Sequence, residues 1–83
     1  MTGEIKFPVV AHQRIIVNAD KRDDGFTQAL FAGFDLVSPV TVVNTSANGK
    51  YVSYALSVRL KDRTEMAQLD AAIAQVPGLK MCL

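Results

Sequence analysis

The chain has 83 residues, which is enough for one compact domain and too few for a second hydrophobic core. Its formal net charge of +1 excludes a protein-wide field that would gather nucleic acid or an anionic membrane. The single cysteine, Cys82, excludes an internal disulfide, and no apolar run approaches the roughly 18 residues of a membrane span, so we expect a protein of the reducing cytoplasm.

A strand and a helix are the first predicted elements. Residues 12–18 mix β-branched and polar side chains, which is typical of a strand. After a charged loop, apolar residues recur at every fourth position and predict a helix that Asp23 or Asp24 would cap. The predicted apolar face of this helix consists of Phe26, Leu30 and Phe34, with Ala29 and Gly33 on the same side.

Two strands joined by a tight turn come next. Residues 38–45 form the second predicted strand, which opens with Pro39, where a missing backbone donor does least harm. The Asn48-Gly49 pair predicts the turn, because both residues tolerate positive φ. The strand after the turn alternates, and its core side holds Val52, Tyr54, Leu56, Val58 and Leu60. Tyr54 is therefore expected to be a core tyrosine with its hydroxyl at the rim, whereas Tyr51 lies on the other face.

The second helix has the clearest pattern in the chain. Asp62 followed by Glu65 resembles a capping box. The apolar stripe of the helix consists of Met66, Leu69, Ile73 and Val76. The Pro77-Gly78 pair ends the helix, and residues 79–83 alternate apolar and polar side chains as a short last strand.

The resulting order β-α-β-β-α-β predicts an α+β, ferredoxin-like fold. Its four-stranded antiparallel sheet has the spatial order 4-1-3-2, and right-handed crossovers place both helices on one face. We expect residues 1–83 to form this single domain, with residues 1–8 as a flexible start. The other face of the sheet has no cover within one chain, so it is solvated, paired with another subunit, or functional.

Successive side chains of a strand point to opposite faces of the sheet, and this alternation, called parity below, predicts which side chains occupy the uncovered face. They are His12, Arg14, Ile16 and Asn18 from the first strand, Tyr51, Ser53, Ala55, Ser57 and Arg59 from the third, and Lys80 and Cys82 from the last. Within this set the candidate binding site consists of Arg14, Tyr51, Ser53, Arg59 and Lys80. Guanidinium groups beside a tyrosine suit an acidic peptide or a carboxylate ligand. The alternatives are an ordinary solvated face and a face that pairs two subunits.

RNA recognition and catalysis are less well supported by the residues. Recognition domains with this topology stack bases on outward aromatic residues two positions apart, but Tyr51 and Tyr54 are three apart and point to opposite faces. His12 is the only histidine, and Cys82 has only Lys80 near it in sequence as a group that could lower its pKa. We therefore expect no nucleic-acid site, catalytic group, metal site or cofactor.

Several landmarks together resemble a known family. They are Phe7-Pro8, Arg14, the hairpin "NGKYVSY" with Tyr51 and Ser53, and the ending "LKMCL". They resemble the YbeD-like family of small bacterial proteins, often labelled lipoate regulatory proteins, and the resemblance implies an ACT-like variant of the ferredoxin fold. The chain departs from the family at Arg14, where lysine is usual, and at Val17, where glycine is usual. Since no glycine lies between Val17 and Asp24, the amino-acid site of ACT-type domains is not carried over.

We therefore expect a small bacterial regulatory or adaptor protein that acts by binding, without catalysis. Its expected partner is another protein or a second copy in a homodimer, with no membrane contact. The alternative function is a sensor of a small carboxylate or amino-acid-like molecule, with a site at a subunit interface. The loop of residues 18–24 separates these functions, because a pocket there with free backbone amides would favour the sensor.

Overall fold

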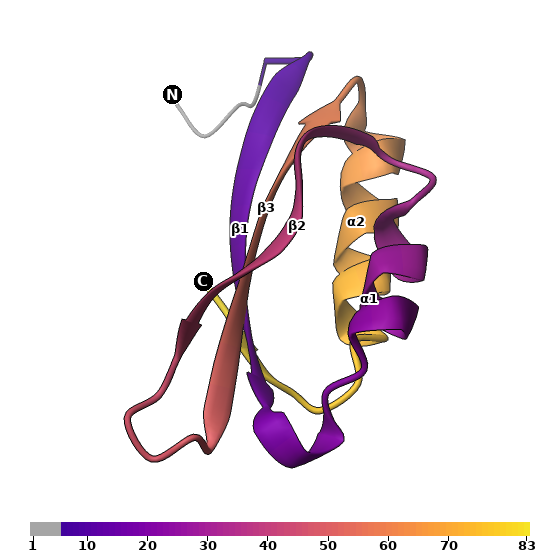
Figure 1. Ribbon diagram of the computed structural model, residues 1–83. Helices are drawn as coiled ribbons and strands as arrows, with labels where there is room; N and C mark the ends of the chain where they lie inside the picture. Colours follow the sequence, from indigo (N-terminus) through magenta and orange to yellow (C-terminus); the bar gives the residue numbers. More distant parts are fainter. Residues whose placement is uncertain (1–5) are drawn as a thin grey trace.

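The computed structural model describes residues 6–83 and confirms the predicted order of elements (Figure 1). In chain order the elements are β1 (Val9–Asn18), the 3-10 turn η1 (Ala19–Lys21), α1 (Asp24–Phe31), β2 (Asp35–Thr45), β3 (Tyr51–Leu60), α2 (Arg63–Ala74) and β4 (Leu79–Cys82). The flexible start expected for residues 1–8 lies mostly outside the described residues. Within them, Phe7 is half-buried and packs against the core.

The strands form one antiparallel sheet in the order β2-β3-β1-β4, which is the predicted 4-1-3-2 order. The central pair, β1 and β3, runs in uninterrupted register from Val9 opposite Leu60 to Asn18 opposite Tyr51. Figure 1 shows both helices on one side of this sheet and no layer on the other. The fold is therefore α+β and ferredoxin-like, with one uncovered sheet face.

The predicted turn joins β2 to β3. Gly49 adopts the left-handed conformation with φ of 71°, which explains why glycine follows Asn48. The Ser46 hydroxyl accepts hydrogen bonds from the amides of Lys50 and Tyr51, both at 3.0 Å. These bonds fix where β3 begins, and with it the parity of the whole strand.

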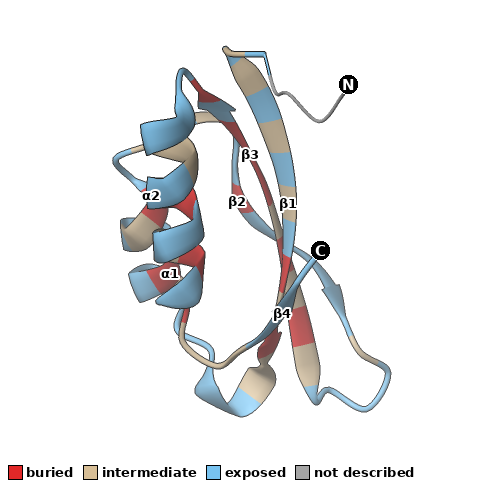
Figure 2. Ribbon diagram, turned by 180° about the vertical axis from the view of Figure 1, so that it is seen from behind, coloured by how far each residue is buried: buried red, intermediate tan, exposed pale blue. Residues whose placement is uncertain are grey.

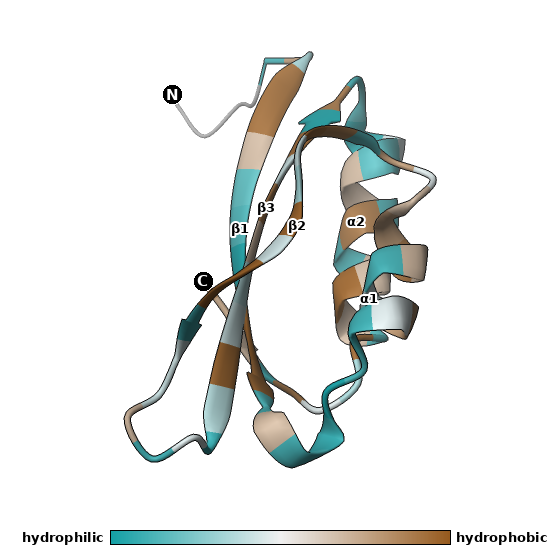
Figure 3. Cartoon of the chain, viewed as in Figure 1, coloured by the Kyte–Doolittle hydropathy of each residue, from teal (hydrophilic) through white to brown (hydrophobic). Residues whose placement is uncertain are grey.

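The core lies between the helices and the sheet (Figure 2), and both of these layers contribute hydrophobic residues (Figure 3). All five predicted core residues of β3 are buried, together with Ile15 and Val17 of β1. The predicted stripe of α2 is also confirmed, because Leu69, Ile73 and Val76 are buried and Met66 packs against them. Asp62 caps this helix as expected by accepting a hydrogen bond from the Glu65 amide at 2.9 Å.

The predicted face of α1 is wrong at Phe26, which is 48% exposed, and at Ala29 and Gly33, which are also exposed. Leu30 and Phe34 do pack against the core, but the fully buried residues are Thr27 and Phe31. Asp23 caps the helix by accepting a hydrogen bond from the Phe26 amide, so α1 begins at Asp24. The Asp24 carboxylate also accepts a hydrogen bond from the Tyr54 hydroxyl, so Asp24 lies on the side of α1 that faces the sheet. Residues three and seven positions later, Thr27 and Phe31, consequently face the sheet as well.

The first two strands begin earlier than predicted, at Val9 and Asp35. Pro39 therefore lies inside β2 and does not open it. The proline is tolerated because β2 is an edge strand whose register with β3 shifts between Leu36 and Ser38 and again between Ser38 and Thr41.

Because Phe31 of α1 faces the sheet and Phe26 does not, truncation of these two phenylalanines should change stability unequally. Phe31→Ala should lower the free energy of unfolding by about 3 to 5 kcal/mol, because it leaves a cavity in the core. Phe26→Ala should cost less than about 1 kcal/mol, because half of this side chain is already in water. Denaturant unfolding of both variants measures the difference. A loss for Phe26→Ala that equals or exceeds the loss for Phe31→Ala would contradict this account, because it would mean that Phe26 is packed in the core.

Candidate binding surface

The uncovered side of the sheet, called the open face below, carries alternate residues of β1 and β3. His12 lies opposite Ser57, Arg14 opposite Ala55, and Ile16 opposite Ser53. Their neighbours in sequence, such as Ile15 and Val17, are fully buried under the helices, so the pairs named above point away from the core. The predicted face is thus confirmed for these two strands.

The prediction for β4 is wrong at Cys82. A register shift between Ile16 and Val17 leaves an extra residue in β4, so that Met81 lies opposite Ile16 and Cys82 lies opposite Ile15. Cys82 is thereby turned to the helix side, where its thiol lies 3.0 Å from the Gln13 side-chain oxygen. Partial burial, with a smaller contribution from the Asp70 carboxylate, raises the pKa of this thiol, so Lys80 does not activate it.

Four of the five candidate site residues lie in the half of the open face nearest the hairpin. The Lys80 ammonium lies 5.5 Å from the centre of the Tyr51 ring, which is a cation–π contact. Arg14 and Ser53 lie further along β1 and β3 on the same face. Arg59 does not join them, because it is eight residues from Tyr51 on β3, a distance of about 26 Å at the rise of a strand.

The charges on the open face are unbalanced. Arg59 is neutralised by Asp35, whose carboxylate lies 3.1 Å from its guanidinium. Within residues 6–83, no ion pair involves Arg14 or Lys80. Exposed apolar side chains lie beside these cations, since Met81 is 46% exposed and Leu83 is 69% exposed. The hairpin half of the face is therefore basic and partly apolar.

One contact on the open face joins the only histidine to a serine. The His12 Nδ1 atom lies 2.7 Å from the Ser57 Oγ atom. Both residues were predicted on this face, but only the register of β1 and β3 identifies them as a pair. A serine nucleophile needs a base that a third group orients and an accessible hydroxyl, whereas Ser57 is only 8% exposed and the described residues give His12 no carboxylate partner. The contact is a cross-strand hydrogen bond that fixes the imidazole.

A second polar cluster lies at the rim of the core and confirms the position predicted for the Tyr54 hydroxyl. That hydroxyl donates to the Asp24 carboxylate at 2.5 Å, and Arg22 donates two further hydrogen bonds to the same carboxylate. The Arg22 guanidinium first and the Tyr54 hydroxyl second lower the pKa of Asp24. Desolvation, followed by the hydrogen bond to Asp24, raises the pKa of Tyr54. The cluster ties α1 to the middle of β3.

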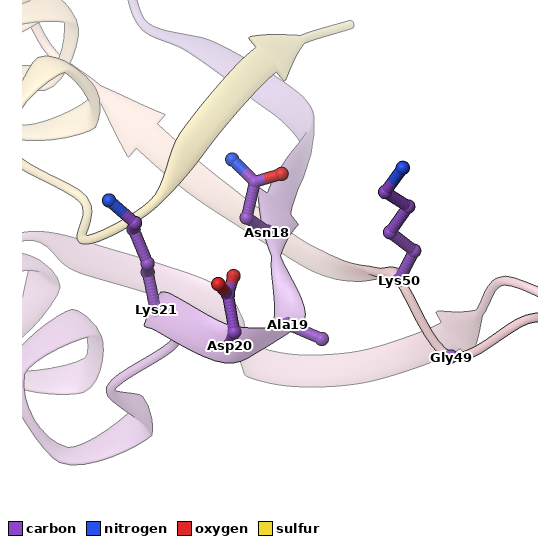
Figure 4. Close-up of a pocket in the computed structure, with 6 residues that line it drawn as sticks. All are labelled: Asn18, Ala19, Asp20, Lys21, Gly49 and Lys50. Carbon is purple, nitrogen blue, oxygen red and sulfur yellow. The ribbon is translucent and has the colours of Figure 1, made fainter.

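A pocket of about 470 Å³ opens at the end of the molecule where β1 meets the hairpin (Figure 4). It is lined by Asn18, Ala19, Asp20, Lys21, Gly49 and Lys50. The loop after β1 therefore does line a pocket, but the surrounding amides are mostly occupied. Those of Asn18 and Ala19 donate to the carbonyls of Gly78 and Lys50 at 2.8 and 2.9 Å, and that of Gly49 donates to Ser46.

Gly78 allows the turn before β4 to pack closely against the end of β1. It adopts a left-handed φ of 74°, and a Cβ atom there would lie 2.9 Å from the Lys21 Cβ and 3.1 Å from the Asn18 carbonyl oxygen. Only glycine lets the turn before β4 approach β1 this closely. In the part of the chain that the structure describes, no group of histidine, cysteine or acidic residues is placed to hold a metal. No described helix is long and apolar enough to cross a membrane.

Comparison with protein families identifies the group to which the chain is related. A profile described as "Protein of unknown function (DUF493)" matches residues 3–83. The chain belongs to this family. The resemblance to the YbeD-like proteins is thus confirmed as family membership, while the regulatory label and the ACT-like character stay proposals. No curated protein matches the chain.

Two solved structures share the fold. Both are solution structures of HP0495 from Helicobacter pylori. The first is 19% identical with a TM-score of 0.75, and the alignment covers 99% of this chain and 88% of that chain. The second is 20% identical with a TM-score of 0.64, and the alignment covers both chains completely. At this identity the likeness is evidence for the fold alone.

The polar cluster at the rim predicts a pH dependence of stability. Because the folded-state pKa of Asp24 is lowered from its ordinary 3.8, the carboxylate contributes stability above that value and loses it as the pH falls through the folded-state pKa. Asp24→Asn should therefore be less stable than the natural protein near neutral pH, and the difference should vanish in acid. Thermal melts across the acid range measure it. A difference that persists unchanged in acid would contradict the account.

Proposed function

We propose that the protein is a small regulatory or adaptor protein that binds an acidic segment of another protein on the open face of its sheet. The observation that carries the proposal is the charge imbalance near the hairpin. Arg14 and Lys80 are exposed cations without an acidic partner in the described residues, and the acid of the face, Asp35, is already paired with Arg59. A negative partner surface complements such a site.

The apolar side chains of the same half support a protein partner over a small ion. Ile16, Met81 and Leu83 lie in one row beside the cations, because Met81 pairs with Ile16 and Leu83 pairs with Arg14. Protein interfaces combine an apolar centre with a polar rim that sets orientation. The Arg14 guanidinium suits a carboxylate, with which it can form two parallel hydrogen bonds.

The proposal includes no catalysis. The only histidine is held by Ser57, and partial burial raises the pKa of the only thiol, that of Cys82. The Tyr54 hydroxyl and Asp24 are used in packing α1 on the sheet. These groups have structural partners, whereas Arg14 and Lys80 have no acidic partner within the described residues, which is why binding is the better supported function.

Two arginine variants on the same face test this proposal. The partner is first isolated with the natural protein as bait and identified by mass spectrometry, and its affinity is then measured by titration. Arg14→Ala should weaken binding by about tenfold, the value of one charged hydrogen bond, and leave the melting curve nearly unchanged. Arg59→Ala is the matched control, because its charge is already neutralised by Asp35.

Three outcomes would contradict the proposal. Normal binding by Arg14→Ala would leave the open face as solvated surface. Equal losses for the two variants would indicate a nonspecific charge effect. A loss of binding that accompanies a change in oligomeric state would mean that the face pairs two subunits.

The pocket at the end of β1 favours a second candidate, a sensor of a small carboxylate. Lys21 and Lys50 both line the pocket and offer ammonium groups to an anion, although Figure 4 shows the Asp20 carboxylate between them. The sensor is the second candidate because the amides of four lining residues, Asn18, Ala19, Gly49 and Lys50, already donate within the protein. Recognition would therefore depend mainly on flexible lysine side chains. Binding of free amino acids that Lys21→Ala abolishes and Arg14→Ala does not would support the sensor.

A further inference from the structure

The edge of the sheet beside β4 is only partly paired. Arg14 exchanges two backbone hydrogen bonds with Leu83, of 3.2 and 2.7 Å, so its amide and carbonyl point to β4. In an antiparallel sheet the amide and carbonyl groups of every second residue point to the same neighbouring strand. Those of Val10 and His12 therefore point to the same edge as those of Arg14. Within residues 6–83, no residue pairs with β1 on that side before Arg14. Among the described residues, the amide and carbonyl groups of Val10 and His12 therefore have no backbone partner on this edge.

This open stretch lacks the protection that the opposite edge of the sheet has. On β2, Pro39 and three shifts of register interrupt the edge and make it a poor template for another strand. On β1, residues 9–13 contain no proline and pair with β3 without any shift, so the stretch is straight and regular. The β2 edge is thus protected against another strand and the open stretch of β1 is not. This difference favours a strand partner for β1.

We infer that the acidic segment binds as an added strand on this edge. It would run antiparallel to β1, in line with β4 and past Leu83, and exchange backbone hydrogen bonds with Val10 and His12. The inference deepens the proposed function and depends on it, since it states how the partner segment is held beside Arg14.

The side chains of β1 on the two sides of the sheet specify the chemistry of the segment that would pair beside them. Side chains that point to the open face would lie beside His12 and Arg14, and the latter favours a carboxylate. Side chains that point to the helix side would lie beside Val9 and Ala11, which are half-buried and apolar. The fitting partner is an extended segment in which acidic residues alternate with apolar ones.

Amide hydrogen exchange of the full chain tests the inference. The probe is a short synthetic peptide of alternating glutamate and valine residues, added to nitrogen-15-labelled protein. The amides of Val10 and His12 should exchange at least about tenfold more slowly at saturation, as expected for new hydrogen bonds. The amides of Ala11 and Gln13 are internal controls, because they point to β3 and are already bonded. The same peptide methylated on alternate backbone nitrogens should not bind.

A proline variant separates backbone pairing from side-chain recognition. His12→Pro removes an amide that β1 does not use within the described chain, and His12→Ala removes only the contact with Ser57. His12→Pro should bind the peptide about tenfold more weakly than His12→Ala, with both variants folded. If His12→Pro unfolds, the methylated peptide on the natural protein makes the same distinction.

The outcomes also separate this inference from the proposed function. If Arg14→Ala weakens peptide binding but His12→Pro matches His12→Ala, the proposed function stands and the added strand is wrong. If His12→Pro weakens binding and Arg14→Ala does not, the added strand stands and its charge basis fails. No peptide binding, changes confined to the pocket, or slowed exchange that rises with protein concentration alone would overturn the inference, the last by identifying a second copy as the occupant.

Discussion

The pairing of β3 with β1 is the constraint on which the rest of the structure depends. Ten residues of each strand face one another without a shift of register. On the helix side, β3 buries five side chains, each no more than 2% exposed, and β1 adds Ile15 and Val17. The helices pack on these residues, and the Tyr54 hydroxyl fixes α1 through Asp24. The burial of this apolar surface is the main source of stability in so small a domain.

The same pairing produces the surface to which we assign function. Since both crossovers run over one side of the sheet, the residues that alternate with the core cannot be covered within the chain. Among residues 6–83, the short β4 pairs with only part of β1, so an exposed face and an open edge meet beside Arg14. Neither feature needs a catalytic group, and together they suit the binding of an extended protein segment.

The features that were predicted correctly depend on local pattern. Alternation in residues 51–60, the spacing of the α2 stripe and the Asn48-Gly49 turn each have a direct physical meaning, and two right-handed crossovers then determine the strand order. The phase of α1 could not be read from spacing, because Phe26, Leu30 and Phe34 fit a helical face as well as Thr27 and Phe31 do. The hydrogen bond between Asp24 and Tyr54, thirty residues apart, decided it.

The candidate site was only partly predictable for similar reasons. Parity placed Arg14, Tyr51 and Ser53 correctly, because β1 and β3 are regular. Parity failed at Cys82, because the register shift between β1 and β4 cannot be recognised from the few residues of β4. Arg59 was assigned to the same face but lies far from Tyr51, because parity gives the face of a residue and not its position along the strand. The open edge at His12 required the register of β4, which the sequence alone does not contain.

The central claim is that the partner binds the side of the sheet opposite the helices. Methyl resonances of one isoleucine and one methionine on each side test it most directly, with Ile16 and Met81 on the open face and Ile73 and Met66 on the helix side. Addition of the isolated partner should shift or broaden the signals of Ile16 and Met81 and leave those of Ile73 and Met66 in place. Changes confined to Ile73 and Met66 would show that the helices form the binding surface and would contradict the account.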